Sequence, residues 1–330
     1  MSAHFRASRR HALAALLCTA SLMALAPATA DAQDSYPDKP VKLITNFPAG
    51  GPLDILGRAL AVPLQSELKQ PFVVDNRPGA GGNIGADVVA KAAPDGYTVL
   101  LSIDTPFTIN PHVYPTMPFA EKDLKPLMIF SSSGLAFGVN PSVGAKTLPE
   151  FVEQAKKKEM SFSSAGNGSP GHLAAEIFGT ATGAKILHVP YKGNAPAVTA
   201  LLAGEVQAGI LATPGLLPHI QAGKVKPLAV TGRQRAPLLP DVPTVGELGL
   251  PKMEFEVMYL AMVPAATPEP IVAKLQKAMA AALALPDVKQ RLASLDMNAL
   301  GETGKAATER LASAKARYGA VVKATGMKAE

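Results

Sequence analysis

Two glycine-rich turns carry the residues best suited to chemistry, and each follows a strand-like run and precedes a helix-like one. The first lies in residues 46–60, NFPAGGPLDILGRAL, and the second in residues 161–178, SFSSAGNGSPGHLAAEIF. A helix start presents unpaired N–H groups and the positive end of the helix dipole, which together favour an anion. Glycine lets the backbone approach a ligand closely because it has no Cβ. We therefore expect an anionic ligand to bind between the two turns.

The side chains of these turns supply one acidic acceptor and several neutral hydrogen-bonding groups. Asp54 either caps its helix or accepts a hydrogen bond from a ligand hydroxyl, amine or bound water. Ser163, Ser164 and Ser169 add hydroxyl donors in the second turn, and His172 either contacts a ligand or caps its neighbours. Neither turn contains arginine or lysine. Neutral donors could hold the two ends of a small dicarboxylate and still release it, as a receptor must.

Nucleotide binding is disfavoured by the glycine spacing. A phosphate loop needs G-x-x-x-x-G-K-[ST], which neither turn has. The segment RPGAGGNIGADVV has a G-x-G at Gly79 and Gly81, and Asp104 stands where an acid that binds ribose is expected. However, Gly85 comes one residue late for the dinucleotide motif, and residues 76–78 separate the strand from the glycines. A loop that turns tightly and starts a helix is the favoured interpretation.

Hydrolase and metal chemistry are also disfavoured. The stretch NGSPG resembles a nucleophile elbow, but Asn167 replaces its first glycine and Pro170 has no N–H for an oxyanion hole after Ser169. Histidines outside the N-terminal region form no H-x-H or H-E-x-x-H pattern: His112, His172, His188 and His219. We expect no enzymatic activity, no metal and no cofactor, with an exported enzyme acting on a carboxylate or ester as the alternative.

Residues 1–30 have the layout of a secretory signal peptide. Arg6, Arg9 and Arg10 precede an apolar run of about fifteen residues, which is too short for a membrane span, and small residues at 28–30 follow. Cleavage would remove three arginines, lowering the net charge from +6 to +3, and with them Cys18. The remaining charge does not favour nucleic acid. These features predict a soluble periplasmic protein, exported by either the general or the twin-arginine route.

Strand-like and helix-like runs alternate along the rest of the chain, which is typical of parallel sheets covered by helices. Pro63 is expected to kink or end the first helix. Residues 125–140 and 254–264 are long extended segments that we interpret as two crossings between lobes. The sequence therefore predicts an α/β fold with two lobes and a cleft between them, with these bounds: residues 36–134 plus 258–330, and residues 135–257.

Several segments, in one order, resemble the substrate-binding proteins of tripartite tricarboxylate transporters, also called Bordetella uptake gene receptors. They are YPDKPVKLITNFPAGGPLDILGRAL, NRPGAGGNIGADVVAKAAPDGYTVLL, SSAGNGSPGHLAAE, HVPYKGNAPAVTALLAGEV and LPHIQAGKVKPLAVTG. The resemblance implies a Venus flytrap receptor that closes on a small carboxylate, often with ordered water, and delivers it to membrane permease subunits. It implies that the loops at residues 48–54 and 164–172 line the cleft.

The chain departs from the family pattern at a few positions. Gln207 stands where an aspartate is common, Leu211 and Ala212 where acidic or polar residues are frequent, and Phe107 where smaller or polar residues are usual. The last difference could alter which ligand is accepted. The ligand itself, and transport as against presentation to a sensor, stay open, and we expect a monomer. The predicted ligand-binding residues are Phe47, Pro48, Ala49, Gly50, Gly51, Asp54, Asp104, Thr105, Ser164, Asn167, Gly168, Ser169, His172, Tyr191 and Thr213.

Overall fold

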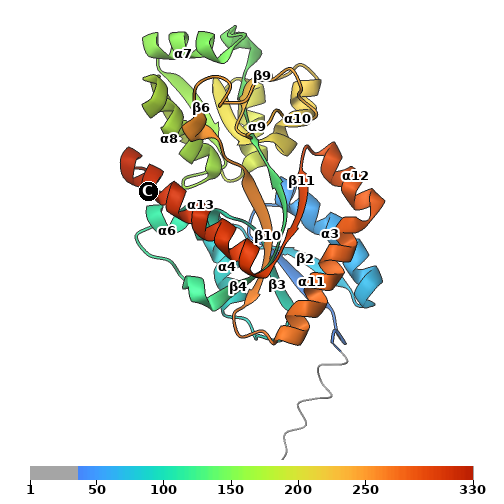
Figure 1. The fold of residues 1–330 in the computed structure, drawn as a ribbon. Helices are drawn as coiled ribbons and strands as arrows, with labels where there is room; N and C mark the ends of the chain where they lie inside the picture. Colours follow the sequence, from blue (N-terminus) through green and yellow to red (C-terminus); the bar gives the residue numbers. More distant parts are fainter. Residues whose placement is uncertain (1–35, 330) are drawn as a thin grey trace, which may run out of the picture. The chain divides into compact units, whose positions relative to one another are not determined.

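The computed structural model describes residues 36–329, so the predicted signal peptide lies outside the described residues. The elements discussed below lie in one compact unit that begins at Lys39, and this unit contains two β-sheets flanked by helices (Figure 1). None of the helices in residues 36–329 combines the length and the apolarity needed to cross a membrane.

The first sheet, sheet A, has the strand order β11-β4-β10-β3-β1-β2. Strands β1, β2 and β3 are parallel, whereas β10, β4 and β11 run antiparallel to their neighbours. The strand bounds are β1 Val41–Thr45, β2 Phe72–Asn76, β3 Thr98–Ile103, β4 Leu124–Ser133, β10 Val257–Pro264 and β11 Asn298–Glu302.

The second sheet, sheet B, has the order β7-β6-β8-β5-β9. Here β6, β7 and β8 are parallel and β5 pairs antiparallel with β8 and β9. The expectation of parallel sheets is thus correct only for three strands in each sheet. The strand bounds are β5 Leu135–Val139, β6 Met160–Ser164, β7 Ile186–Pro190, β8 Ala208–Ala212 and β9 Lys226–Val230.

Helices cover the sheets and carry much of the chain between parallel strands. The α-helices are α3 Pro52–Leu68, α4 Asn83–Ala90, α5 Thr105–Thr108, α6 Asn110–Val113, α7 Leu148–Lys157, α8 Pro170–Thr182, α9 Asn194–Ala203, α10 Thr213–Gln221, α11 Glu269–Ala284, α12 Pro286–Ser294 and α13 Gly304–Thr325. Short 3-10 helices are η1 Ala80–Gly82, η2 Glu121–Asp123, η3 Pro141–Val143 and η4 Pro251–Met253.

Pro63 does not end the first helix, and two elements near the C-terminus were not expected from the sequence. Helix α3 continues past Pro63 to Leu68 and packs against β2 and α11. In the C-terminal region, α12 and β11 lie between α11 and α13, and the sequence analysis indicated neither of them. Strand β11 is short and largely exposed, so it lacks the apolar alternation that would reveal it.

The chain crosses between the two sheets where the sequence predicted extended segments. Gly134 alone separates β4 of sheet A from β5 of sheet B. The buried Thr231 ties the crossings together, because its Oγ1 accepts the N–H of Leu135 at 2.9 Å and donates to the carbonyl of Phe255 at 2.8 Å. This network connects the end of β9, the start of β5 and the segment that enters β10.

Each sheet has its own apolar core. Residues such as Ile44, Leu100 and Leu260 form the core on sheet A, and Phe107 belongs to it, stacked obliquely on Phe119. On sheet B, Phe137 makes edge-to-face contacts with other buried rings: Phe151, Phe162 and Phe178. The departure at Phe107 therefore fills the core of sheet A.

Candidate functional site

The first glycine turn joins β1 to α3 and is held by Asp54. The carboxylate accepts the N–H of Gly50 at 3.0 Å, pairs with Arg58 at 3.1 Å, and accepts the amide of Asn76 at 3.1 Å. Burial alone would raise the pKa of Asp54, but the hydrogen bonds from Gly50 and Arg58 outweigh it, so the pKa lies below its ordinary value. Asp54 thus shapes the turn, and Gly51 begins α3 with no side-chain cap.

The second glycine turn joins β6 to α8. Ser169 caps α8 by accepting the N–H of His172 at 3.3 Å, and Pro170 occupies the start of the helix. A Cβ on Gly171 would lie 2.2 Å from the carbonyl oxygen of Ile210, so only glycine allows the start of α8 to lie this close to β8. Both turns therefore direct a helix N-terminus to the carboxyl ends of parallel strands.

Two stacked histidines hold the second turn in place through hydrogen bonds. The rings of His172 and His188 lie 3.9 Å apart and nearly parallel. His172 Nδ1 accepts the N–H of Gly168 at 3.2 Å, and His188 Nε2 lies 2.6 Å from Ser164 Oγ, which accepts the N–H of Gly166. Burial and the neighbouring His172 lower the pKa of His188 to about 4. The turn is thus hydrogen-bonded to imidazoles.

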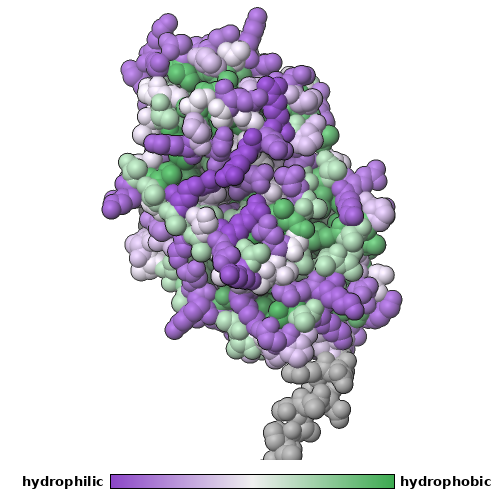
Figure 2. All heavy atoms as spheres, viewed as in Figure 1, coloured by the Kyte–Doolittle hydropathy of each residue, from purple (hydrophilic) through white to green (hydrophobic). Residues whose placement is uncertain are grey.

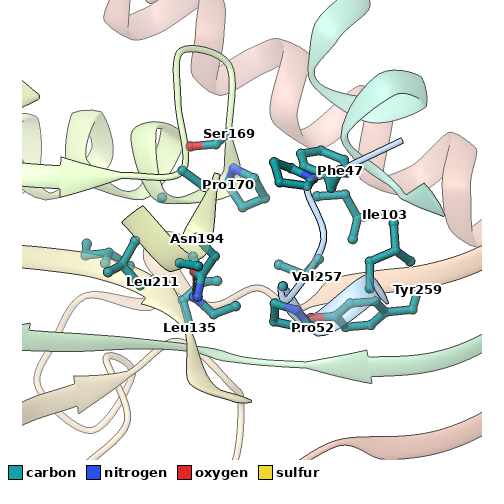
Figure 3. Close-up of a pocket in the computed structure, with 18 of the residues that line it drawn as sticks. Phe47, Pro52, Ile103, Leu135, Ser169, Pro170, Asn194, Leu211, Val257 and Tyr259 are labelled. Atoms are coloured by element: carbon teal, nitrogen blue, oxygen red, sulfur yellow. Dashed lines mark hydrogen bonds between the residues drawn. The ribbon is translucent and has the colours of Figure 1, made fainter. Parts of the chain in front are cut away.

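The two turns face one cavity of about 70 Å³, which we call the cleft cavity (Figure 3). Phe47, Pro52 and Ile103 line it from segments joined to sheet A, and Ser169, Pro170, Asn194 and Leu211 from segments joined to sheet B. Val257 and Tyr259 complete it from the crossing strand β10. None of its lining residues carries a charged side chain.

Three lining side chains have polar groups: Ser169, Asn194 and Tyr259. Asn194 Oδ1 accepts the N–H of Ala212 at 3.1 Å, which leaves its amide NH₂ as the donor. Tyr259 is buried against Ser133, with their hydroxyl oxygens 3.2 Å apart, and burial raises its pKa. Helices α3, α8 and α9 all begin at this cavity, α3 and α9 without side-chain caps. The arrangement combines neutral donors with apolar walls.

Among the residues predicted from sequence, a third line the cleft cavity: Phe47, Pro48, Ala49, Gly51 and Ser169. Others support the same two turns from outside the cavity: Gly50, Asp54, Ser164, Gly168 and His172. Asn167 lies in the second turn without lining the cavity.

The remaining predicted residues lie elsewhere. The buried Asp104 accepts the N–H of Met258 at 3.1 Å and the hydroxyl of Thr108, and burial raises its pKa to about 6. Thr105 is buried next to it. The Tyr191 ring packs on the sheet B core, and Thr213 donates to the carbonyl of Gly134 at 2.9 Å. None of these four lines the cleft cavity.

Several lining residues were missed from the sequence. Asn194 follows a glycine where β7 is succeeded by α9, so the reasoning used for the other two turns could have found it. Leu135, Val257 and Tyr259 lie on crossing segments, and no sequence pattern marks them as facing a ligand. The departures at Leu211 and Ala212 do lie in the cavity wall, whereas Gln207 accepts hydrogen bonds from Ser161.

Comparison with known proteins agrees with this architecture. Residues 56–327 match the family model described as "Tripartite tricarboxylate transporter family receptor". The chain is 36% identical to Protein BugT of Bordetella pertussis over 299 residues, covering 89% of this chain and 92% of that protein.

Two solved structures from Rhodopseudomonas palustris are similar over most of the chain. Rpa4515 with adipate has a TM-score of 0.85 at 32% identity, covering 89% of this chain and 99% of that one. MatC with bound malate has a TM-score of 0.80 at 28% identity, covering 87% of this chain and 100% of that one. The fold is thus the two-lobed fold of periplasmic binding proteins, and the chain belongs to the receptor family of tripartite tricarboxylate transporters.

Proposed function

We propose that this chain is a periplasmic receptor that binds a small carboxylate in the cleft cavity and delivers it to the permease subunits of a tripartite tricarboxylate transporter. The observation that carries the proposal is the cavity itself. Three helix N-termini meet there, and no charged side chain lines it. Backbone N–H groups at helix starts stabilise anions without a fixed counter-charge.

The apolar walls narrow the class of ligand. Ile103, Leu135, Leu211 and Val257 line the cavity together with the two glycine turns, so a ligand would place its hydrocarbon body against them. A dicarboxylate with an aliphatic or aromatic body fits this pattern better than a densely charged tricarboxylate. The relatives solved with adipate and malate support a carboxylate, and adipate has the more apolar body.

The proposal includes two lobes, residues 36–134 plus 258–330 and residues 135–257, that close on the ligand as a monomer. Strands of the first range belong to sheet A and those of the second to sheet B, with β10 as the returning crossing. Ligand contacts from both glycine turns would favour the closed form, because a ligand shifts an equilibrium only by its differential affinity.

A calorimetric and thermal-shift comparison tests the function. The chain from Asp31 onward would be titrated with adipate, malate, citrate and an aromatic dicarboxylate. We expect one dicarboxylate to bind with one-to-one stoichiometry and to raise the melting temperature, since binding to the folded form stabilises it. Protein from the producing cells would also be denatured and searched for retained carboxylate. No binding and no retained carboxylate would contradict the proposal, and consumption of the ligand would indicate an enzyme.

A further inference from the structure

A second cavity lies on the other side of the crossing segments, and we call it the hinge-side cavity. Its volume is about 660 Å³. Along each crossing segment, successive residues line the hinge-side cavity and the cleft cavity alternately. Met258 lines the hinge-side cavity while Val257 and Tyr259 line the cleft cavity, and Gly134 is on the hinge side where Leu135 is on the cleft side. Because side chains alternate along a strand, one wall separates the two cavities.

The hinge-side cavity is rich in guanidinium groups, which the cleft cavity lacks. Four arginines line it: Arg233, Arg235, Arg310 and Arg317. Two of them are neutralised, because Arg235 pairs with Glu247 at 3.0 Å and Arg310 pairs with Glu302 at 2.6 Å and with Glu256 at 3.7 Å. In the part of the chain that the structure describes, Arg233 and Arg317 form no ion pair with a carboxylate.

Three acidic residues also line the cavity, and two of them accept hydrogen bonds. Glu256 accepts the hydroxyl of Ser132 at 2.8 Å besides its contact with Arg310, and Asp296 accepts the N–H of Leu238 at 3.2 Å. The Glu254 carboxyl lies over Gly246, where a Cβ would come within 1.9 Å of its Oε1. Among the described residues, Arg233 and Arg317 thus have no ion-pair partner, while Glu254 and Asp296 line the same cavity without pairing with a cation.

Arg233 and Arg317 come from different parts of the fold. Arg233 follows β9 of sheet B, and Arg317 lies on α13, which packs on β4 of sheet A. Tyr318 positions Arg317, because the guanidinium lies 5.1 Å from the ring centroid and 3.4 Å from the hydroxyl oxygen. Helix α13 lies on the face turned toward the viewer in Figure 1, and hydrophilic residues cover much of the middle of that face in Figure 2.

We propose that the hinge-side cavity is a second binding site, for a small oxyanion held between Arg233 and Arg317. Guanidinium groups form paired, charge-assisted hydrogen bonds with phosphate and carboxylate oxygens. An anion with two charged ends can contact both arginines. This site is separate from the proposed carboxylate site, since its arginines lie across the wall from the cleft cavity.

Pyrophosphate is the probe that tests this site, because its two charged ends can reach two guanidinium groups. Its affinity would be measured by calorimetry for the native chain from Asp31 onward, and for the double variant Arg233→Gln with Arg317→Gln. The matched control is Lys274→Gln with Lys277→Gln, which removes the same charge from exposed positions on α11 outside the cavity.

We expect the native chain and the lysine control to bind one pyrophosphate equally, and the arginine double variant to bind it about tenfold more weakly or worse. The single variant Arg233→Gln, in an exposed loop, should give an intermediate loss and guards against misfolding of the double variant. Equal binding by all variants, or no binding by the native chain at millimolar pyrophosphate, would overturn the proposal.

Discussion

The cleft cavity and the hinge-side cavity share the wall formed by the crossing segments but differ in chemistry. The cleft cavity measures about 70 Å³ and has no charged lining residue, whereas the hinge-side cavity measures about 660 Å³ and has four arginines. Single-residue alternation along β10 assigns Met258 to one side and its neighbours to the other. Neutral backbone donors suit a cargo that must be released. Fixed guanidinium charge suits an anion that contacts two arginines at once.

The largest expected effect comes from putting a negative charge into the neutral cavity. Ala195 lines it in the first turn of α9, where an acidic residue is favourable for the helix. Ala195→Asp should therefore fold normally but weaken dicarboxylate binding by about 3 kcal/mol, from charge repulsion at short range. Calorimetry would measure the loss, and Ala195→Asn is the neutral control. Equal affinities for the two variants would remove α9 from the site.

A steric change at the first turn should have a somewhat smaller effect. Gly51 has a φ of −80°, and a Cβ there would lie 3.4 Å from the carbonyl oxygen of Pro48, so larger residues fit the backbone. Gly51→Val should leave the melting temperature nearly unchanged and weaken carboxylate binding by about 2 kcal/mol, because its methyl groups enter the cavity. Gly51→Ala should lose less. A folded valine variant with native affinity would contradict the role of this turn.

Because the two cavities share a wall, we expect a ligand bound in one cavity to weaken the binding of a ligand in the other. An anion bridging Arg233 and Arg317 would draw the two sides together on the hinge face and so resist narrowing of the cleft. Saturating pyrophosphate should weaken adipate binding by about 1–2 kcal/mol, and adipate should weaken pyrophosphate binding equally. Competition calorimetry measures both, and the effect should vanish in the arginine double variant. Unchanged affinities would mean that the wall does not couple the sites.

Ser169 has a helix-capping role and a position in the cavity wall, and one variant separates them. Ser169→Ala removes the cap of α8 and should lower the free energy of unfolding by about 1 kcal/mol. Because the hydroxyl accepts from His172, its own hydrogen is available to the ligand, and affinity should also fall by about 1 kcal/mol. A stability loss without an affinity loss would limit Ser169 to the cap.

A last expected effect, on stability and not on affinity, is a pH dependence from the histidine pair. The pKa of His188, about 4 in the folded chain against an ordinary 6.5, means that only the unfolded chain gains this proton between those values. The free energy of unfolding should therefore fall as the pH drops from 6.5 to 4.

Denaturant titrations of the native chain and of His188→Gln would measure this fall. Glu176 and His172 are the titratable groups that face His188, and both remain in the variant. Asp104, with a pKa near 6, acts in the opposite direction in both proteins, so the difference between them isolates His188. Identical pH profiles would exclude His188 as the cause.

Predictions from the sequence succeeded where a local pattern determines the structure. The two glycine turns, their helix starts and the two crossing segments follow from residues adjacent in the chain, and the turn residues Gly51 and Ser169 do line the cleft cavity. The candidates at strand ends do not line this cavity, and their role in binding stays a prediction. Asp104 and Thr213 follow strands as expected, yet their side chains bind the crossing segments.

The sequence by itself determined the alternating α/β pattern, the neutral glycine turns and, through its resemblance, the receptor family. Only the tertiary structure decided which neighbouring residues face which cavity. That assignment depends on how β4, β5, β9 and β10 cross and pair, and a shift by one residue would turn each side chain to the opposite face. The grouping of Arg233 with Arg317 depends on packing between segments more than eighty residues apart, which no local pattern encodes.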